Sequence, residues 1–262
     1  MGRSDGELLD AVRKGERDAV DELLSRYEAS IYRFGLRMCG NEEAAREVLQ
    51  ETLLAAFRNL STFRGDAAVS TWLYQIARSF CIKERRGEHA TEPLEGKAGE
   101  RLTEPSPSPE GRAHAREIGA ALAAGISALP PEYREVLVLR DVEGLSADEA
   151  AAVVGIESGA LKSRLHRARM QLRAELAGLL GESELGPAPC PDLAQELTAY
   201  AAAEIDQAAC LRIEEHLSRC PRCAGACDAL KRSVSLCRRI PGGEVPAPVR
   251  AAVRHAIRAL TT

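Results

Sequence analysis

The residues best suited to chemistry form a histidine–cysteine cluster near the C-terminal end, with H-x3-C-x2-C spacing. His216 precedes Cys220 by about one helical turn, and Cys220 and Cys223 are separated by two residues. One imidazole and two thiolates at this spacing are typical zinc ligands, and Cys190, further back in the chain, would complete a tetrahedral Cys3His set. Such a closed set predicts structural Zn2+, because no coordination position stays open for catalysis.

Other cysteines of the same segment leave alternatives open. Cys210 and Cys227 compete with Cys190 for the fourth position, and Cys227 follows Cys223 by one helical turn. The alternative to a metal site is a set of reduced, unliganded thiols at a helix end. Zinc thiolates can also be oxidised, so the site could be redox-sensitive, with Cys227 and Cys237 either taking part or remaining inert.

A second informative stretch is strongly basic although the net charge of the chain is -4. Between Lys162 and Arg173 there are five basic side chains and no acidic one. The side chains that point away from the apolar face of this predicted helix could contact DNA bases, whereas the remaining arginines would lie nearer phosphates. The base-side candidates are Lys162, Ser163, His166 and Arg167, and the phosphate candidates are Arg164, Arg169 and Arg173.

The elements around the basic stretch favour a helix-turn-helix. Ser146 and Glu149 have the spacing of a capping box, Gly155 can end the short helix that they open, and Ser158 can cap the next one. The second helix of such a motif enters the major groove of DNA. A solvated basic face on a helical hairpin is the alternative.

Apolar residues recur at intervals of three or four along most of the chain, and no strand pattern stands out, which predicts an all-α fold. Eight of the ten aromatic residues lie between Tyr27 and Phe80, so the first third is built differently from the rest. We expect a helical domain (1–87), a Pro-rich flexible linker (88–114), the helix-turn-helix domain (115–180), a zinc-binding domain (187–240) and a tail with an amphipathic basic helix (241–262). The tail helix could dock on the preceding helical domains or remain a solvated terminal helix.

Composition excludes several function classes. No window is apolar and long enough for a membrane span, and the first residues lack the apolar stretch of a secretory signal, so a cytoplasmic location is expected. No Ser-His-Asp set, phosphate-binding Gly-rich loop or open metal site is present. The sequence therefore predicts a protein that is not an enzyme.

Residues 126–146, which begin Ile-Ser-Ala-Leu-Pro-Pro, and residues 161–169, which begin Leu-Lys-Ser-Arg, closely resemble region 4 of extracytoplasmic-function (ECF) sigma factors of the sigma-70 family. The resemblance implies a DNA-binding domain that reads the -35 promoter element. Ala160 departs from the family, which usually has Thr there. The motif covers about 50 residues in register and is highly specific.

Residues 18–86 resemble region 2 of the same family. Ala45–Thr52 matches the helix that grips the β′ clamp helices of RNA polymerase, which implies polymerase contacts for Glu47, Gln50 and Glu51; a solvated helix face is the alternative. The segments 63–66 and 70–78 resemble the part that reads the -10 element. The resemblance makes residues 61–69 a pocket for unpaired bases and puts Arg78, Arg85 and Arg86 near phosphates, although Ser79 and Lys83 depart from the family's Asn and Asp.

Cys190–Leu230 resembles the zinc-binding anti-sigma domain, which usually sits on a separate protein. The match is looser, because Ala201–Glu204 replaces the usual Leu-Asp-Gly-Glu. Together these resemblances imply a sigma factor that binds core RNA polymerase (β′ clamp helices and β flap) and promoter DNA, with regulation in cis by the zinc domain through contacts with the sigma domains. Whether that domain inhibits or assists stays open. One alternative is a helix-turn-helix regulator with a zinc-stabilised dimerisation or sensor module, and a second is a partner-binding protein whose zinc domain sequesters another sigma factor.

Overall fold

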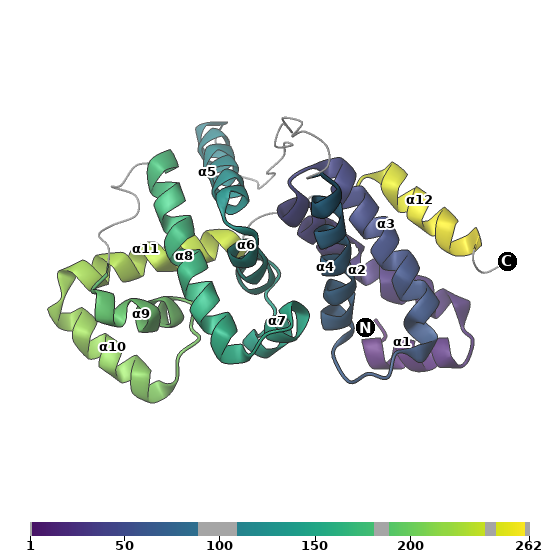
Figure 1. The fold of residues 1–262 in the computed structure, drawn as a ribbon, viewed down its shortest axis with the longest axis horizontal. Helices are drawn as coiled ribbons and strands as arrows, with labels where there is room; N and C mark the ends of the chain where they lie inside the picture. The colour runs from purple at the N-terminus through teal and green to yellow at the C-terminus, as the bar shows by residue number, and fades with distance from the viewer. Residues whose placement is uncertain (1, 89–108, 181–188, 239–244, 260–262) are drawn as a thin grey trace. The chain divides into compact units, whose positions relative to one another are not determined.

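The computed structural model describes residues 2–88, 109–180, 189–238 and 245–259 (Figure 1). Every regular element in these ranges is a helix and none is a strand, which confirms the all-α fold class. Most of the predicted linker lies outside the described residues. Within the described ranges, no helix combines the length and the hydropathy that crossing a bilayer requires.

Contacts between residues divide the chain into two compact units. The first comprises Met1–Glu100, Ala152–Gly155 and Gly242–Thr262, and the second comprises Arg101–Ala151 and Ile156–Pro241. The second unit therefore contains both the basic stretch and the cysteine cluster. The five-part division expected from the sequence stays a prediction.

The first unit begins with four α-helices and one 3-10 turn. They are α1 (Asp5–Arg13), α2 (Arg17–Cys39), α3 (Glu42–Asn59), η1 (Leu60–Thr62) and α4 (Val69–Glu88). Gly40 and Asn41 form the α2–α3 boundary: Gly40 adopts a left-handed φ of 81°, and the Asn41 side chain accepts a hydrogen bond of 2.7 Å from the Ala44 N–H.

The apolar face of α3 is buried against α2 and α4. Gly35 lets α2 approach α3 closely, because a Cβ there would lie 3.1 Å from the Cα of Ala45. Phe34 on α2 and Tyr74 on α4 pack edge to face with ring centroids 5.4 Å apart. This packing fixes which face of α3 stays exposed.

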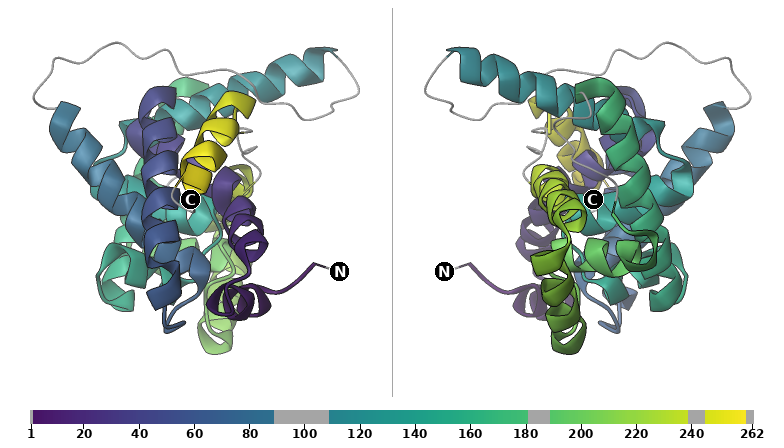
Figure 2. Two further views of the ribbon diagram at one scale, coloured as in Figure 1. Left: turned by 90° about the vertical axis from the view of Figure 1, so that its right-hand side faces the viewer. Right: turned by 90° about the vertical axis from the view of Figure 1, so that its left-hand side faces the viewer.

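Helix α12 (Ala247–Ala259) belongs to the first unit and lies against α3 (Figure 2). Val253 and Ile257 are buried, and Arg250 Nε lies 3.3 Å from a carboxylate oxygen of the nearly buried Glu28. Burial raises the pKa of Glu28, and the charges of Arg254 and Arg250 oppose that rise. The amphipathic tail helix is therefore docked rather than solvated.

The helices of the helix-turn-helix segment belong to the second unit, except for Ala152–Gly155 at the end of α7. They are α5 (Pro109–Ala128), α6 (Pro131–Leu137), the π-helical turn η2 (Val138–Val142), α7 (Ala147–Val154) and α8 (Ser158–Leu180). The predicted capping box is confirmed, with hydrogen bonds of 2.8 Å from the Ser146 N–H to the Glu149 carboxylate and 3.2 Å from the Glu149 N–H to the Ser146 hydroxyl. Gly155 ends α7 with a left-handed φ of 78°.

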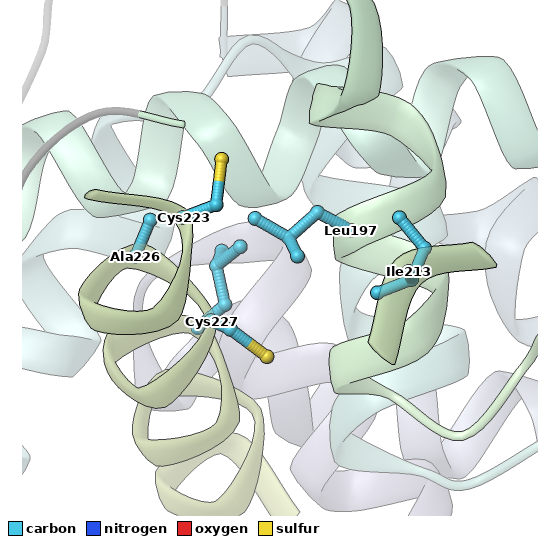
Figure 3. Close-up of a cluster of buried hydrophobic side chains, with 6 residues drawn as sticks. Leu197, Ile213, Cys223, Ala226 and Cys227 are labelled. Carbon is cyan, nitrogen blue, oxygen red and sulfur yellow. The ribbon is translucent and has the colours of Figure 1, made fainter. Parts of the chain in front are cut away.

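The cysteine-rich segment of the second unit contains a 3-10 turn and three α-helices. They are η4 (Pro191–Leu193), α9 (Ala194–Ala201), α10 (Gln207–Arg219) and α11 (Pro221–Arg238). Their small core joins Leu197, Ile213, Cys223, Ala226 and Cys227 (Figure 3). Helices α9 and α11 also pack against α8, so this segment is part of the same unit as the basic helix.

Candidate metal centre and nucleic-acid interface

The four predicted metal ligands converge in the second unit. Cys190 precedes η4, His216 lies in the last turn of α10, and Cys220 and Cys223 flank the start of α11. One ligand atom from each residue can be chosen so that all four lie within 4.8 Å of one another. The ring nitrogen Nε2 of His216 is buried and has no hydrogen-bond partner, as expected of a metal-ligating nitrogen. The donor set therefore fits one tetrahedral Zn2+.

The thiols of this cluster influence one another's ionisation. Hydrogen bonding to the Cys223 sulfur is the largest effect that raises the pKa of Cys190, to about 11, and burial adds to it. A hydrogen bond from the Cys223 backbone N–H instead lowers the pKa of Cys220. The Cys190 N–H also donates to Cys223 Sγ at 3.3 Å. Like charges this close repel each other, so a cation bound between the sulfurs would stabilise the thiolate forms of Cys190 and Cys220.

The competing cysteines lie outside this cluster. Cys227 is buried in the core shown in Figure 3, and burial raises the pKa of its thiol. Cys210 lies 3.5 Å from the Glu214 carboxylate, which it faces on α10. Cys237 is also buried. None of the cysteines in the described part of the chain forms a disulfide.

The basic side chains of α8 differ in exposure. Lys162 and Arg167 are exposed, whereas Ser163, Arg164 and His166 are half-buried. Arg164 approaches the Glu135 carboxylate at 3.6 Å. Lys162 and Arg167 are thus the predicted DNA contacts that solvent reaches most freely.

Arg169 is enclosed rather than exposed, with a fractional exposure of 5%. Its Nε and Nη2 donate to the two carboxylate oxygens of Asp141 at 2.8 and 2.6 Å, and Nη1 and Nη2 donate to those of Glu204 at 3.1 Å each. Nη1 also donates to the backbone oxygen of Thr198 at 3.4 Å. Arg140 donates to the same Glu204 carboxylate. The predicted phosphate contact is therefore engaged inside the protein, in part by the cysteine-rich segment.

His166 is also held by that segment. Its Nδ1 lies 3.0 Å from the hydroxyl oxygen of Thr198, which is 2% exposed. The Thr198 hydroxyl donates to the Gln195 carbonyl oxygen at 2.8 Å, so Nδ1 must be the donor toward Thr198. Burial lowers the pKa of His166, and the charges of Arg167 and Arg169 lower it further.

The end of α9 directs Glu204 toward these arginines. The Glu204 N–H donates to the Ala199 carbonyl at 2.8 Å and the Ala203 N–H to the Tyr200 carbonyl at 3.0 Å, which is the hydrogen-bond pattern of a Schellman motif. Such a motif needs a left-handed residue, usually Gly, and Ala203 fills the position with a φ of 58°. The Arg238 side chain holds the turn by donating to the Ala202 carbonyl at 3.1 Å.

In the first unit, the predicted polymerase contacts share the exposed side of α3. Glu47, Gln50 and Glu51 are exposed, while the opposite face of the helix is buried. The structure thus leaves them available for a partner.

The predicted -10 segment joins η1 to α4. Phe63 packs on Trp72 with ring centroids 4.8 Å apart, and the loop residues Arg64–Ala68 are exposed. Trp72, Phe80 and Arg78 are half-buried. Arg85 and Arg86 fall in the last turns of α4, where the structure does not describe side chains.

Comparisons with known proteins match three families in chain order. Residues 23–91 match Sigma-70 region 2, residues 120–172 match Sigma-70, region 4, and residues 190–224 match a zinc-finger family. An ECF RNA polymerase sigma factor SigM of Mycobacterium tuberculosis is 36% identical over 186 residues, covering 70% of this chain and 88% of the relative. The SigE factor of Mycolicibacterium smegmatis is 36% identical over 159 residues, which span 60% of this chain and 61% of that relative.

A solved structure of CnrH in complex with the cytosolic domain of CnrY is similar as well. It is 25% identical, with a TM-score of 0.50, and covers 65% of this chain and 96% of that chain. Fold and matches together define a transcription initiation factor of the sigma-70 type, which is not an enzyme. The chain belongs to the ECF sigma factor family and has a C-terminal zinc-finger domain of the anti-sigma-like kind.

Sequence reasoning missed the partners of the basic helix. No motif in the sequence points to Asp141, Thr198 and Glu204 as partners of the basic helix. The single hint was the departure at Ala201–Glu204, where the glutamate is retained while its neighbours differ. No spacing rule links residues so far apart in the chain.

Proposed function

We propose that this sigma factor binds core RNA polymerase through the exposed side of α3 and promoter DNA through α4, the 61–69 loop and α8. Glu47, Gln50 and Glu51 contact the β′ clamp helices, and the helix-turn-helix unit contacts the β flap and the -35 element. The observation that carries the polymerase contact is the polar, exposed face of α3 opposite a fully packed one. Binding to polymerase and DNA implies a cytoplasmic location.

The test is affinity for purified bacterial core polymerase. We expect the full chain to bind and the double charge reversal Glu47→Lys/Glu51→Lys to weaken binding by at least tenfold. Asp18→Lys, an exposed acidic residue of α2, is the matched control and should bind like the wild type. Absence of binding by the wild type would favour the rival function, a helix-turn-helix regulator that acts without polymerase.

On the metal, the proposal is that Cys190, His216, Cys220 and Cys223 hold one structural Zn2+. When bound, the ion supplies the cation that lets three thiolates pack together, and it ties η4, α10 and α11 into one domain. The residues themselves orient the site: the Cys190 N–H donates to Cys223 Sγ, and the start of α11 favours the Cys220 thiolate. Oxidation of these thiolates would release the ion, which makes the domain redox-sensitive.

Metal content measured by mass spectrometry tests the ligand set. We expect one zinc per chain, lost in Cys220→Ala and in His216→Ala and retained in Cys210→Ala. Retention of stoichiometric zinc by both ligand variants would contradict the assignment. Hydrogen peroxide should release the zinc of the wild type. Unchanged zinc content after this treatment would contradict the proposed redox sensitivity and leave the ligand assignment standing.

The zinc domain regulates the sigma domains in cis. Its helices α9 and α11 pack against α8 in one compact unit, which supports this proposal. Transcription by polymerase reconstituted with the wild type or with Cys220→Ala/Cys223→Ala should therefore differ. Equal transcription, together with loss of zinc, would show that the domain has no regulatory effect.

A further inference from the structure

Arg140 and Arg169 of the helix-turn-helix segment together hold one carboxylate of the zinc domain. Arg169 Nη1 and Nη2 donate to the two carboxylate oxygens of Glu204, and Arg140 donates to one of them as well. Two guanidinium groups on one anion form a site that also suits a phosphate, because both ligands offer oxygen acceptors to a fork of N–H donors. The pair is thus an anion site filled from within the chain.

Arg169 donates hydrogen bonds to acceptors in two parts of the chain, its own helix-turn-helix segment and the zinc domain. Asp141, which follows Arg140 in η2, accepts two of them, and the zinc domain accepts three, through Glu204 and the Thr198 carbonyl. If the zinc domain left, Asp141 would still pair with Arg169. Arg140 would lose the carboxylate to which it donates, although its charge also acts on Glu149.

The same contact covers part of the face that is expected to meet DNA. His166 donates to Thr198, one turn before Arg169 on α8, while Lys162 and Arg167 stay exposed. A zinc domain seated on α8 therefore leaves some of the basic residues open and occupies others. DNA that approached the whole face would have to displace α9.

We propose that Glu204 occupies a phosphate site of the promoter-binding surface, so that the zinc domain and DNA compete for α8. The proposal rests on the proposed DNA-binding function of α8 and names the regulation of that same surface. Helix α9 supplies the competing anion, and the left-handed turn at Ala203 directs that anion at Arg140 and Arg169. The rival explanation is an ion pair that only stabilises the fold.

Glu204→Gln in the full chain separates these explanations. The amide keeps the shape of the side chain but removes its charge. The probe is a short random-sequence DNA duplex, titrated over a series of salt concentrations. We expect tighter binding at low salt, and a salt dependence of the binding constant that is steeper by about 0.9, the change for one added phosphate contact.

Glu196→Gln is the matched control. Glu196 lies on the same helix, α9, but its exposed carboxylate pairs with Arg212 at 3.5 Å rather than with α8. The substitution changes the net charge equally, so it should leave the salt dependence at the wild-type slope. Equal slopes for Glu204→Gln and the wild type, or equal changes in both variants, would overturn the proposal.

Thr198→Val keeps the proposal testable if Glu204→Gln unfolds, which thermal melting would reveal. It removes the hydroxyl that accepts from His166 without changing any charge. As for Glu204→Gln, we expect tighter DNA binding than in the wild type, together with faster amide hydrogen exchange in α9. Unchanged exchange and affinity would overturn the proposal.

Arg167→Ala tests separately whether α8 binds DNA at all. Its result distinguishes a failure of the competition proposal from a failure of the proposed DNA-binding function. Arg167 is exposed, whereas the residues of α8 that hydrogen-bond to Thr198 and Glu204 are His166 and Arg169. If this variant binds DNA more weakly while Glu204→Gln has the wild-type slope, α8 binds DNA but does not compete. If Arg167→Ala binds as well as the wild type, the assignment of α8 to DNA is wrong.

Discussion

Burial changes the role expected of Arg169. From its place among the basic residues it is a phosphate contact, but in the structure it lies between the carboxylates of Asp141 and Glu204. Its hydrogen bonds to both carboxylates keep its pKa above the ordinary value despite burial, so it remains charged. An arginine so enclosed holds two segments together.

Removing this arginine should destabilise the second unit strongly. Arg169→Ala leaves the buried Asp141 carboxylate without its partner, and breaking a buried pair in this way costs about 3–5 kcal/mol. Chemical denaturation, followed by helical circular dichroism, measures the loss. Arg167→Ala is the exposed control and should change the free energy of unfolding by less than about 0.5 kcal/mol. A similar small change in both variants would contradict the assigned role.

Ala203 carries a backbone conformation that suits glycine better. A left-handed φ of 58° costs an alanine about 1 kcal/mol. Ala203→Gly should therefore raise the free energy of unfolding by up to about 1 kcal/mol, since the relief of strain exceeds the entropy that glycine adds to the unfolded chain. Ala202→Gly, at a φ of -93°, should lower it. Stabilisation by both substitutions would show that strain at Ala203 is not the cause.

His166 gives the contact between α8 and α9 a pH dependence. Because burial and the neighbouring Arg167 and Arg169 lower its pKa in the folded state, the unfolded chain binds its proton more readily. The stability from this residue is fully present above 6.5, the ordinary pKa of histidine, and is lost as the pH falls from there through the lower pKa of the folded state. Unfolding measured at several pH values should show a smaller acid loss in His166→Gln than in the wild type. Parallel curves would contradict this sign.

At the scale of helices, the sequence indicates more about where elements begin and end than about their internal form. Gly155 and the Ser146 capping box mark boundaries that the structure confirms, because each residue acts on its own stretch of backbone. The helix that begins at Pro131, by contrast, changes to a π turn after Leu137, with the Glu143 N–H donating to the Val138 carbonyl at 2.9 Å. Local propensity does not distinguish these two forms, since both place apolar residues on one face.

The candidate sites also differ in how far the sequence predicts them: local spacing indicates some of their residues, and packing between helices determines the others. The candidate metal ligands follow from spacing, because three of them lie within eight residues of the chain, from His216 to Cys223, and Cys190 comes from a distance. The exposed face of α3 follows from the periodicity of its buried face. The pairing of Arg169 with Glu204 depends on how α9 packs on α8, and no local pattern in either helix specifies that packing.

At the scale of the whole molecule, the packing of α12 on α3 in the first unit can be tested by itself. Val253 is 1% exposed, and an aspartate there would bring a charge into an apolar contact. In Val253→Asp we expect α12 to detach, which trypsin would report as faster cleavage after Arg254. Ala252→Asp, an exposed position of the same helix, should be cleaved like the wild type. Equal cleavage of the two variants would argue against the docked tail.

The membership of α12 has a topological consequence. Helices α4 and α12 belong to the first unit and α5 and α11 to the second, so the backbone joins the two units before α5 and again after α11. The second unit is thus connected to the first at both of its ends, and α12 binds α3 as an intramolecular ligand. The strength of that contact therefore does not depend on the concentration of the protein, and dilution cannot separate α12 from α3.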